Sequence, residues 1–270
     1  MDFSNTSFLI AFGLTLIAGL STGIGSAMAF FAKKTNTNFL SVALGFSAGV
    51  MIYISFVELY VLGEDSFVKQ YGDKLGSTYN FLFFMAGMLL IAIIDRLVPS
   101  YENPHEVHRV EEMNSSDLKK RKLMRTGLFS AVVIGIHNFP EGVATFAAGL
   151  SDLSIAIPIT IAIAIHNIPE GIAVSIPIYY ATNSRKKAFW YSFSSGLAEP
   201  VGGLIGYLIL RTYLNEVVLG ATFSIIAGIM VFISLDELLP TAKEYGKPHA
   251  AIYGLIAGIS VMALSLILFK

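Results

Sequence analysis

The sequence has 270 residues, of which 54% are hydrophobic and only 14% charged, with a mean hydropathy of +0.68 and a formal net charge of −1. This composition is far more apolar than that of an ordinary soluble domain, and it lacks the basic surplus typical of nucleic-acid binding. The chain contains no cysteine, which excludes disulfides, thiolate metal sites and cysteine nucleophiles. The composition predicts an integral membrane protein, and any metal chemistry must use His, Met or carboxylate groups.

Eight apolar stretches are long enough to cross the ~30 Å hydrocarbon core of a bilayer as helices. The first begins after Asp2, where a signal peptide would be basic, so we interpret it as a retained helix. Together the stretches predict an all-α integral membrane protein, one transmembrane domain over residues 1–270. They lie near 7–31, 38–61, 79–98, 127–150, 154–179, 187–210, 217–240 and 249–269.

The positions of Lys and Arg predict the orientation of this eight-helix bundle, because cytoplasmic loops carry an excess of both. All but four of the 18 lie in or beside alternate connections, starting with the one between the first two helices. This pattern places both termini outside the cytoplasm and the polar connection 99–126, with His105 and His108, inside it. We expect that loop to be mobile and its histidines to be solvated, with transient metal binding as the alternative. The four exceptions are Lys69, Lys74, Arg211 and Lys270.

One motif occurs twice in the chain, as IHNFPEG at 136–142 and as IHNIPEG at 165–171. In each copy the histidine and the glutamate are four residues apart, so both lie on one face of a helix. The proline, Pro140 or Pro169, has no amide hydrogen and therefore frees a backbone carbonyl and predicts a kink. Each copy predicts a bent helix with an imidazole, an amide and a carboxylate on one side.

The two copies are expected to meet near the middle of the membrane. Each histidine lies about 15–18 Å from the start of its helix, and a short turn makes the fourth and fifth helices antiparallel. Ionisable side chains at this depth are costly and need a partner, so we regard them as candidate ligands. The set is His137, Asn138 and Glu141 on one helix, His166, Asn167 and Glu170 on the next, and Glu199 in SSGLAEP on the sixth.

Nitrogen and oxygen ligands without thiolate suit Zn²⁺, Fe²⁺, Mn²⁺, Co²⁺ or Cd²⁺, and three carboxylates allow one ion or two. Helix packing is the main alternative for a lone buried His or Asn, and the duplication argues against it. Glu199 alone is also compatible with a buried protonated acid. Three further acids lie nearer the helix ends. Glu58 is near the outer end of its helix, and Asp236 and Glu237 are near the inner end of theirs. They line a candidate pathway or simply reach toward water.

These motifs resemble the ZIP (Zrt/Irt-like) family of metal transporters, and within it the bacterial ZupT branch. The likeness rests on both HNxPEG copies, SSGLAEPVGG, GFSAGVMIYISFVEL (45–59) and IAGIMVFISLDELLP (226–240). It implies a binuclear centre whose two glutamates bridge, with Glu58 on the outer approach and Glu237 at the inner exit. The first implied site comprises His137, Glu141, His166 and Glu170, with Met51 approaching. The second comprises Asn138, Glu141, Asn167, Glu170 and Glu199.

We therefore expect a secondary transporter that takes divalent metal into the cytoplasm and needs no catalytic cofactor. The motif GxxxxGK[ST] does not occur, so ATP is not the expected source of energy. The alternative is an intramembrane metal-dependent hydrolase, although HNxPEG lacks the acid that follows the first histidine of HExxH. A metal sensor without flux is a third possibility. The expected partners are metal ions and the lipid bilayer, and the sequence is compatible with a homodimer.

Overall fold

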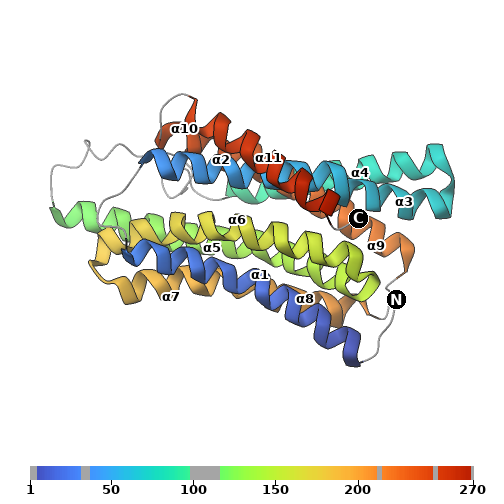
Figure 1. Ribbon diagram of the computed structural model, residues 1–270, viewed down its shortest axis with the longest axis horizontal. Helices are drawn as coiled ribbons and strands as arrows, with labels where there is room; N and C mark the ends of the chain where they lie inside the picture. Colours follow the sequence, from blue (N-terminus) through green and yellow to red (C-terminus); the bar gives the residue numbers. More distant parts are fainter. Residues whose placement is uncertain (1–4, 32–36, 98–115, 212–214, 246–248, 269–270) are drawn as a thin grey trace.

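The computed structural model describes residues 5–31, 37–97, 116–211, 215–245 and 249–268, and the regular structure in these ranges is helical throughout (Figure 1). The predicted all-α class is therefore confirmed for this part of the chain. In chain order the elements are α1 (Asn5–Phe31), α2 (Thr37–Ile54), η1 (Ser55–Leu59), α3 (Tyr60–Tyr71), α4 (Asp73–Leu97), α5 (Ser116–Ser151), α6 (Leu153–Thr182), α7 (Arg185–Gly196), α8 (Ala198–Leu210), α9 (Glu216–Ile233), η4 (Ser234–Leu238), α10 (Leu239–Tyr245) and α11 (Ala250–Leu268).

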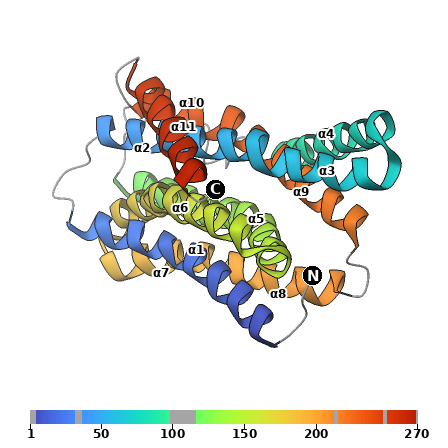
Figure 2. The same ribbon diagram turned by 45° about the vertical axis from the view of Figure 1, so that its right-hand side comes forward.

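The helices form two groups that lie side by side (Figures 1 and 2). One group contains α1, α5, α6, α7 and α8, and the other contains α2, α3, α4, α9, α10 and α11. The main contacts between the groups are those of α2 with α6 and of α5 with α9. Because α5 and α6 carry the two HNxPEG copies, both motifs lie where the two groups meet.

Tight turns set the antiparallel order of neighbouring helices. Asp152 alone separates α5 from α6, and its carboxylate accepts a hydrogen bond from the Ser154 amide at 2.8 Å, which caps α6. Gly72 joins α3 to α4 with a φ of 76°, a left-handed conformation that glycine adopts without strain. Asn183 ends α6 in the same region, with a φ of 51°.

Six helical stretches in the described residues are long and apolar enough to cross a membrane, and large apolar side chains such as Leu9 and Ile267 point outward from the bundle. Each of the eight predicted stretches forms helix where it is described. Two of them, 127–150 and 187–210, are not among these six. Helices α7 and α8 break at Leu197 into pieces of 12 and 13 residues. In α5, basic residues occupy the first turns and the polar HNxPEG residues interrupt the apolar run. A count of eight spans thus stays a prediction.

Several boundaries differ from those predicted. The second stretch continues to Tyr71 through η1 and α3, and the third begins at Asp73. Residues 116–126, predicted as loop, form the first turns of α5, because Lys and Arg are good helix formers. Residues 99–115, with His105 and His108, lie outside the described residues. The helix α5 continues through Pro140 and α6 through Pro169, and the kink expected at each stays a prediction.

A second duplication becomes visible in the structure. AGVMIYISFVEL at 48–59 and AGIMVFISLDEL at 227–238 are each an α-helix that widens into one π-helical turn, η1 or η4. In both copies a serine hydroxyl, Ser55 or Ser234, donates to the backbone carbonyl of the methionine four residues earlier, at 2.7 Å. Single π turns of this kind are rare and often lie at functional sites.

Candidate metal centre

Helices α5 and α6 pack against each other in antiparallel directions, so their HNxPEG motifs lie face to face as predicted. The imidazoles of His137 and His166 have ring centroids 6.4 Å apart. Both rings and the carboxylates of Glu141 and Glu170 are at most 3% exposed. The structure therefore gathers four ionisable side chains in the interior of an apolar bundle.

Glu141 lies between the two imidazoles. Its Oε1 atom is 3.2 Å from Nε2 of His137 and also 3.2 Å from Nε2 of His166. Glu170 approaches from the other helix, with its Oε1 atom 3.4 Å from Nε2 of His137. Each carboxylate thus contacts the histidine of the opposite copy, and neither motif alone builds this arrangement.

The asparagines connect the centre to the helices behind it. The side-chain amide of Asn138 donates to the backbone carbonyl of Ser195 at 3.3 Å, at the end of α7. The amide of Asn167 donates to the carbonyl of Ala18 in α1 at 3.0 Å and to the carboxylate of Glu199 in α8. Glu199, fully buried, is therefore drawn toward the centre, as the sequence predicts.

The break between α7 and α8 positions Glu199. Pro200 cannot donate a backbone hydrogen bond, so the carbonyl of Gly196 loses its usual helical partner. The helix breaks at Leu197, and Glu199 falls in the first turn of α8. A Cβ added at Gly142 of α5 would collide with the backbone carbonyl of Glu199, so the close approach of these helices depends on the glycine of the first motif.

Several oxygen atoms of the centre are buried without a hydrogen-bond partner among the described residues. They are Oδ1 of Asn138, Oδ1 of Asn167, Oε2 of Glu170 and Oε2 of Glu199. Buried polar atoms are nearly always paired, because an unpaired acceptor loses its water and gains nothing in return. Four unpaired acceptors, two of them carboxylate oxygens, form an electronegative cluster that a cation would compensate.

The spacing of the ligand atoms suits a divalent metal. Two ligand atoms that each lie ~2.1 Å from a tetrahedral ion are about 3.4 Å apart. The three contacts between imidazole nitrogens and carboxylate oxygens, at 3.2–3.4 Å, match this separation. Ligand atoms of His137, His166 and Glu170 also lie within 4.8 Å of one another. The donor set, imidazole nitrogen with carboxylate and amide oxygen, is one that borderline divalent cations accept.

The other predicted residues lie in the helix group that contains α2 and α9. Met51 is fully buried in α2, and Ser47, one turn before it, approaches the backbone carbonyl of His166 at 3.5 Å. Glu237 is buried in η4 and close enough to His137 to interact with it electrostatically. Glu58 in η1 is half-buried and Asp236 in η4 is exposed, so neither is enclosed in the centre.

Thr22 of α1 is a polar residue beside the centre that the sequence did not single out. A helical threonine usually donates to the carbonyl four residues earlier, which here belongs to Ala18. That carbonyl already accepts from Ser21 at 2.5 Å and from Asn167, and the buried Thr22 hydroxyl has no hydrogen-bond partner in the described part of the chain. Thr22 packs against Gly196, next to the Asn138 anchor at Ser195. The sequence alone could not show that the Ala18 carbonyl is occupied, because the bond from Asn167 comes from a different helix.

Comparison with known proteins gives consistent matches over nearly the whole chain. The family model described as ZIP Zinc transporter matches residues 95–266. A protein of Streptococcus mutans named Zinc transporter ZupT is 63% identical over 259 residues, covering 96% of this chain and 97% of that protein. Proteins of the same name from Clostridium perfringens and Nitratidesulfovibrio vulgaris are each 58% identical, over 97% of this chain and 96% and 97% of their own lengths.

Proposed function

Because the chain belongs to the ZIP family of zinc transporters, we propose that it takes divalent transition metal ions, zinc first, into the cytoplasm through the buried centre between α5 and α6. Members of this family are secondary transporters and not enzymes. The apolar helices agree with a multi-pass protein of the cell membrane. Fe²⁺, Mn²⁺, Co²⁺ and Cd²⁺ are further proposed substrates, because the same nitrogen and oxygen donors accept them.

One observation carries this proposal, namely the position of Glu141 within 3.2 Å of both imidazoles. A single carboxylate that faces ligands of two helices holds a cation only while those helices stay together. The metal is cargo, so it must also leave the centre. Oxygen donors hold the ion less tightly than thiolates would, and this favours its release. The centre thus combines a closed set of ligands with the weak coordination that transport requires.

We further propose that the centre holds two ions. His137, Glu141, His166, Glu170 and Met51 would serve the first position. The second would use Asn138 and Asn167 with Glu199, and Glu141 and Glu170 would bridge both, as carboxylates do between ions ~3.5–4 Å apart. The unpaired oxygens of both asparagines and of Glu199 support this second position.

The proposed path crosses the membrane through eight spans, with both termini outside the cytoplasm. On this topology η1 lies toward the outer side and η4 toward the inner side, so Glu58 would receive the incoming ion and Glu237 with Asp236 would pass it on. Glu237 is buried and near enough to His137 for their charges to interact, which supports the inner half of this path.

A hydrolase that used the same cluster would need an open coordination position and a route for its substrate. A groove of about 440 Å³ does lie on α5 beside the centre, lined by Val132, Gly135, Ile136, Phe139 and Pro140. None of these residues carries an ionisable group, and the imidazoles and carboxylates of the centre are buried and do not line the groove. The geometry therefore favours transport over hydrolysis.

Zinc uptake into proteoliposomes that contain a zinc-sensitive dye tests the proposal. The double variant Glu141→Gln with Glu170→Gln keeps the side-chain shapes and removes two negative charges, so uptake should fall to the level of empty liposomes. Glu216→Gln, at an exposed position at the start of α9, is the matched control and should transport like the wild type. Wild-type uptake in the double variant would show that the ion does not pass through this centre.

A further inference from the structure

The two segments that share the pattern AG-x-M place their methionines at equivalent positions. Met51 lies one turn before the π turn η1, and Met230 lies one turn before the π turn η4. The carbonyl of each accepts the same serine hydroxyl bond, described above. Both the sequence and the local structure therefore make Met230 the counterpart of Met51.

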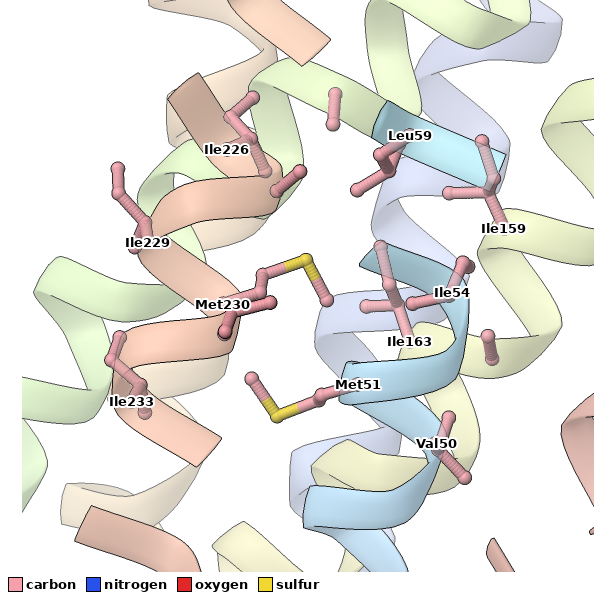
Figure 3. Close-up of a cluster of buried hydrophobic side chains, with 14 of the residues drawn as sticks. Val50, Met51, Ile54, Leu59, Ile159, Ile163, Ile226, Ile229, Met230 and Ile233 are labelled. Atoms are coloured by element: carbon pink, nitrogen blue, oxygen red, sulfur yellow. The ribbon is translucent and has the colours of Figure 1, made fainter. Parts of the chain in front are cut away.

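Helices α2 and α9 bring the two thioethers together. The segments Val50–Leu59 and Ile226–Ile233 run in opposite directions, so they are antiparallel (Figure 3). The side chains of Met51 and Met230 both extend into the space between them. Met51 is 0% and Met230 1% exposed. The pair is thus enclosed at the crossing of the two repeats.

The surroundings of the pair are apolar. Ile54, Ile159, Ile163 and Ile226 belong to the same buried cluster, and every other side chain labelled in Figure 3 is purely hydrocarbon. Within this buried hydrophobic layer, which contains both methionines and the four isoleucines, the thioethers are the groups that could act as metal ligands. Sulfur in a thioether is neutral, polarisable and soft, and it prefers soft cations to hard ones.

This apolar layer borders the metal centre. Ser47, one turn before Met51, reaches the backbone of His166 at 3.5 Å. Glu237, two turns after Met230, is buried near enough to His137 for their charges to interact. On the proposed path, an ion that moves from Glu58 to the imidazoles would pass this layer, and the two thioether sulfurs that face each other there are soft donors within it.

We propose that Met230 is a further cation-binding residue, which forms with Met51 a thioether pair that favours soft divalent cations, Cd²⁺ in particular, at the outer border of the metal centre. The inference rests on the proposed transport function. A cation that binds sulfur well keeps a ligand while it crosses the layer, whereas Zn²⁺ depends mainly on the nitrogen and oxygen donors beyond it. Packing alone would be served equally by leucine at either position.

X-ray absorption at the cadmium edge tests the pair directly on the purified protein with Cd²⁺ bound. Because the chain has no cysteine, any cadmium–sulfur scattering must come from methionine. We expect such scattering in the wild type, about half of it in Met230→Leu, and none when Met51→Leu is added. Met262→Leu in α11, an equally buried methionine of the same core cluster, should match the wild type. A wild-type spectrum without sulfur would overturn the proposal.

Parallel uptake of Cd²⁺ and Zn²⁺ into proteoliposomes tests the effect on selectivity. Met230→Leu conserves volume, and we expect it to lower the ratio of cadmium to zinc uptake roughly tenfold, the lower end of what mutation near a metal ligand costs. A ratio equal to that of Met262→Leu would refute a role for Met230. Failure of the wild type to transport either ion would instead refute the proposed function, and the absorption spectrum would still decide the thioether pair.

Discussion

Replacing Glu141 with glutamine should weaken zinc binding about 100-fold and leave the fold intact. The change removes one negative charge and one acceptor at the point where both imidazoles meet, 3.2 Å from each. Mutation of a group that merely orients a metal ligand costs ~10–100-fold in affinity. Glu141 faces both halves of the centre directly, so we take the upper end, about 2.7 kcal/mol.

Thermal unfolding in detergent, with and without zinc, measures this loss without any transport assay. Zinc at 100 times the dissociation constant stabilises the wild type by about 2.7 kcal/mol, and the same concentration stabilises a variant with 100-fold weaker binding by only about 0.4 kcal/mol. Without zinc, Glu141→Gln should fold as the wild type does, because the amide keeps the shape of the carboxylate and its oxygen can still accept a hydrogen bond from an imidazole.

Glu216→Gln provides the control, since it removes the same charge from an exposed position on α9. It should retain the whole zinc-dependent shift. If Glu141→Gln retained that shift as well, Glu141 would not be a zinc ligand, and the reasoning from its two imidazole contacts would be wrong. If the variant were instead much less stable than the wild type without zinc, the carboxylate would serve the fold and not the ion.

Three further perturbations test how the centre is positioned. Gly142→Ala places a Cβ against a backbone carbonyl of α8 and should lower the free energy of unfolding by about 1–3 kcal/mol in the same thermal assay. Gly135→Ala is the control. Its added Cβ would lie 3.9 Å from the nearest neighbouring atom, so the free energy of unfolding should change by less than ~0.5 kcal/mol. Thr22→Val removes a buried hydroxyl that has no hydrogen-bond partner in the described part of the chain, so it should preserve stability in the same thermal assay. A loss of more than ~1 kcal/mol would show that the hydroxyl is paired. Asp152→Ala removes the cap of α6 and should cost about 1 kcal/mol at neutral pH. Hydrogen bonds from Ser154 lower the pKa of Asp152, so this difference from the wild type should vanish as the pH falls through that lowered pKa.

The core of the centre could be predicted from the sequence because its geometry is local. Residues four apart share a helix face, and a one-residue turn between α5 and α6 leaves little freedom in how the two copies meet. The hydrogen-bond partners of Asn138 and Asn167 could not be predicted, since they are backbone carbonyls of Ser195 and Ala18 in distant helices. Any residue type could supply those carbonyls, so no sequence pattern marks them.

The hydrophobic layer around Met51 also shows where helical periodicity fails to predict which residues are buried. In an uninterrupted α-helix, Glu58 would follow Met51 on the same face, because seven residues are close to two full turns. The π turn η1 accommodates one extra residue and so rotates everything after it by about one position, ~100°. Leu59 thereby takes the buried face with Met51 and Ile54, and Glu58 is left half-buried beside it.

The same turn in η4 has a different result, because the residues around it differ. Glu237 remains only 4% exposed and Leu238 9% exposed, so this repeat keeps its carboxylate inside, close to His137. After one π turn the leucine is buried and the glutamate only half-buried, whereas after its counterpart the glutamate is buried as well. In this structure the carboxylate of η4 is buried near enough to His137 for their charges to interact, and hydrophobic side chains including Leu59 are buried toward η1. On the proposed topology, the ion would be held within reach of its inner exit.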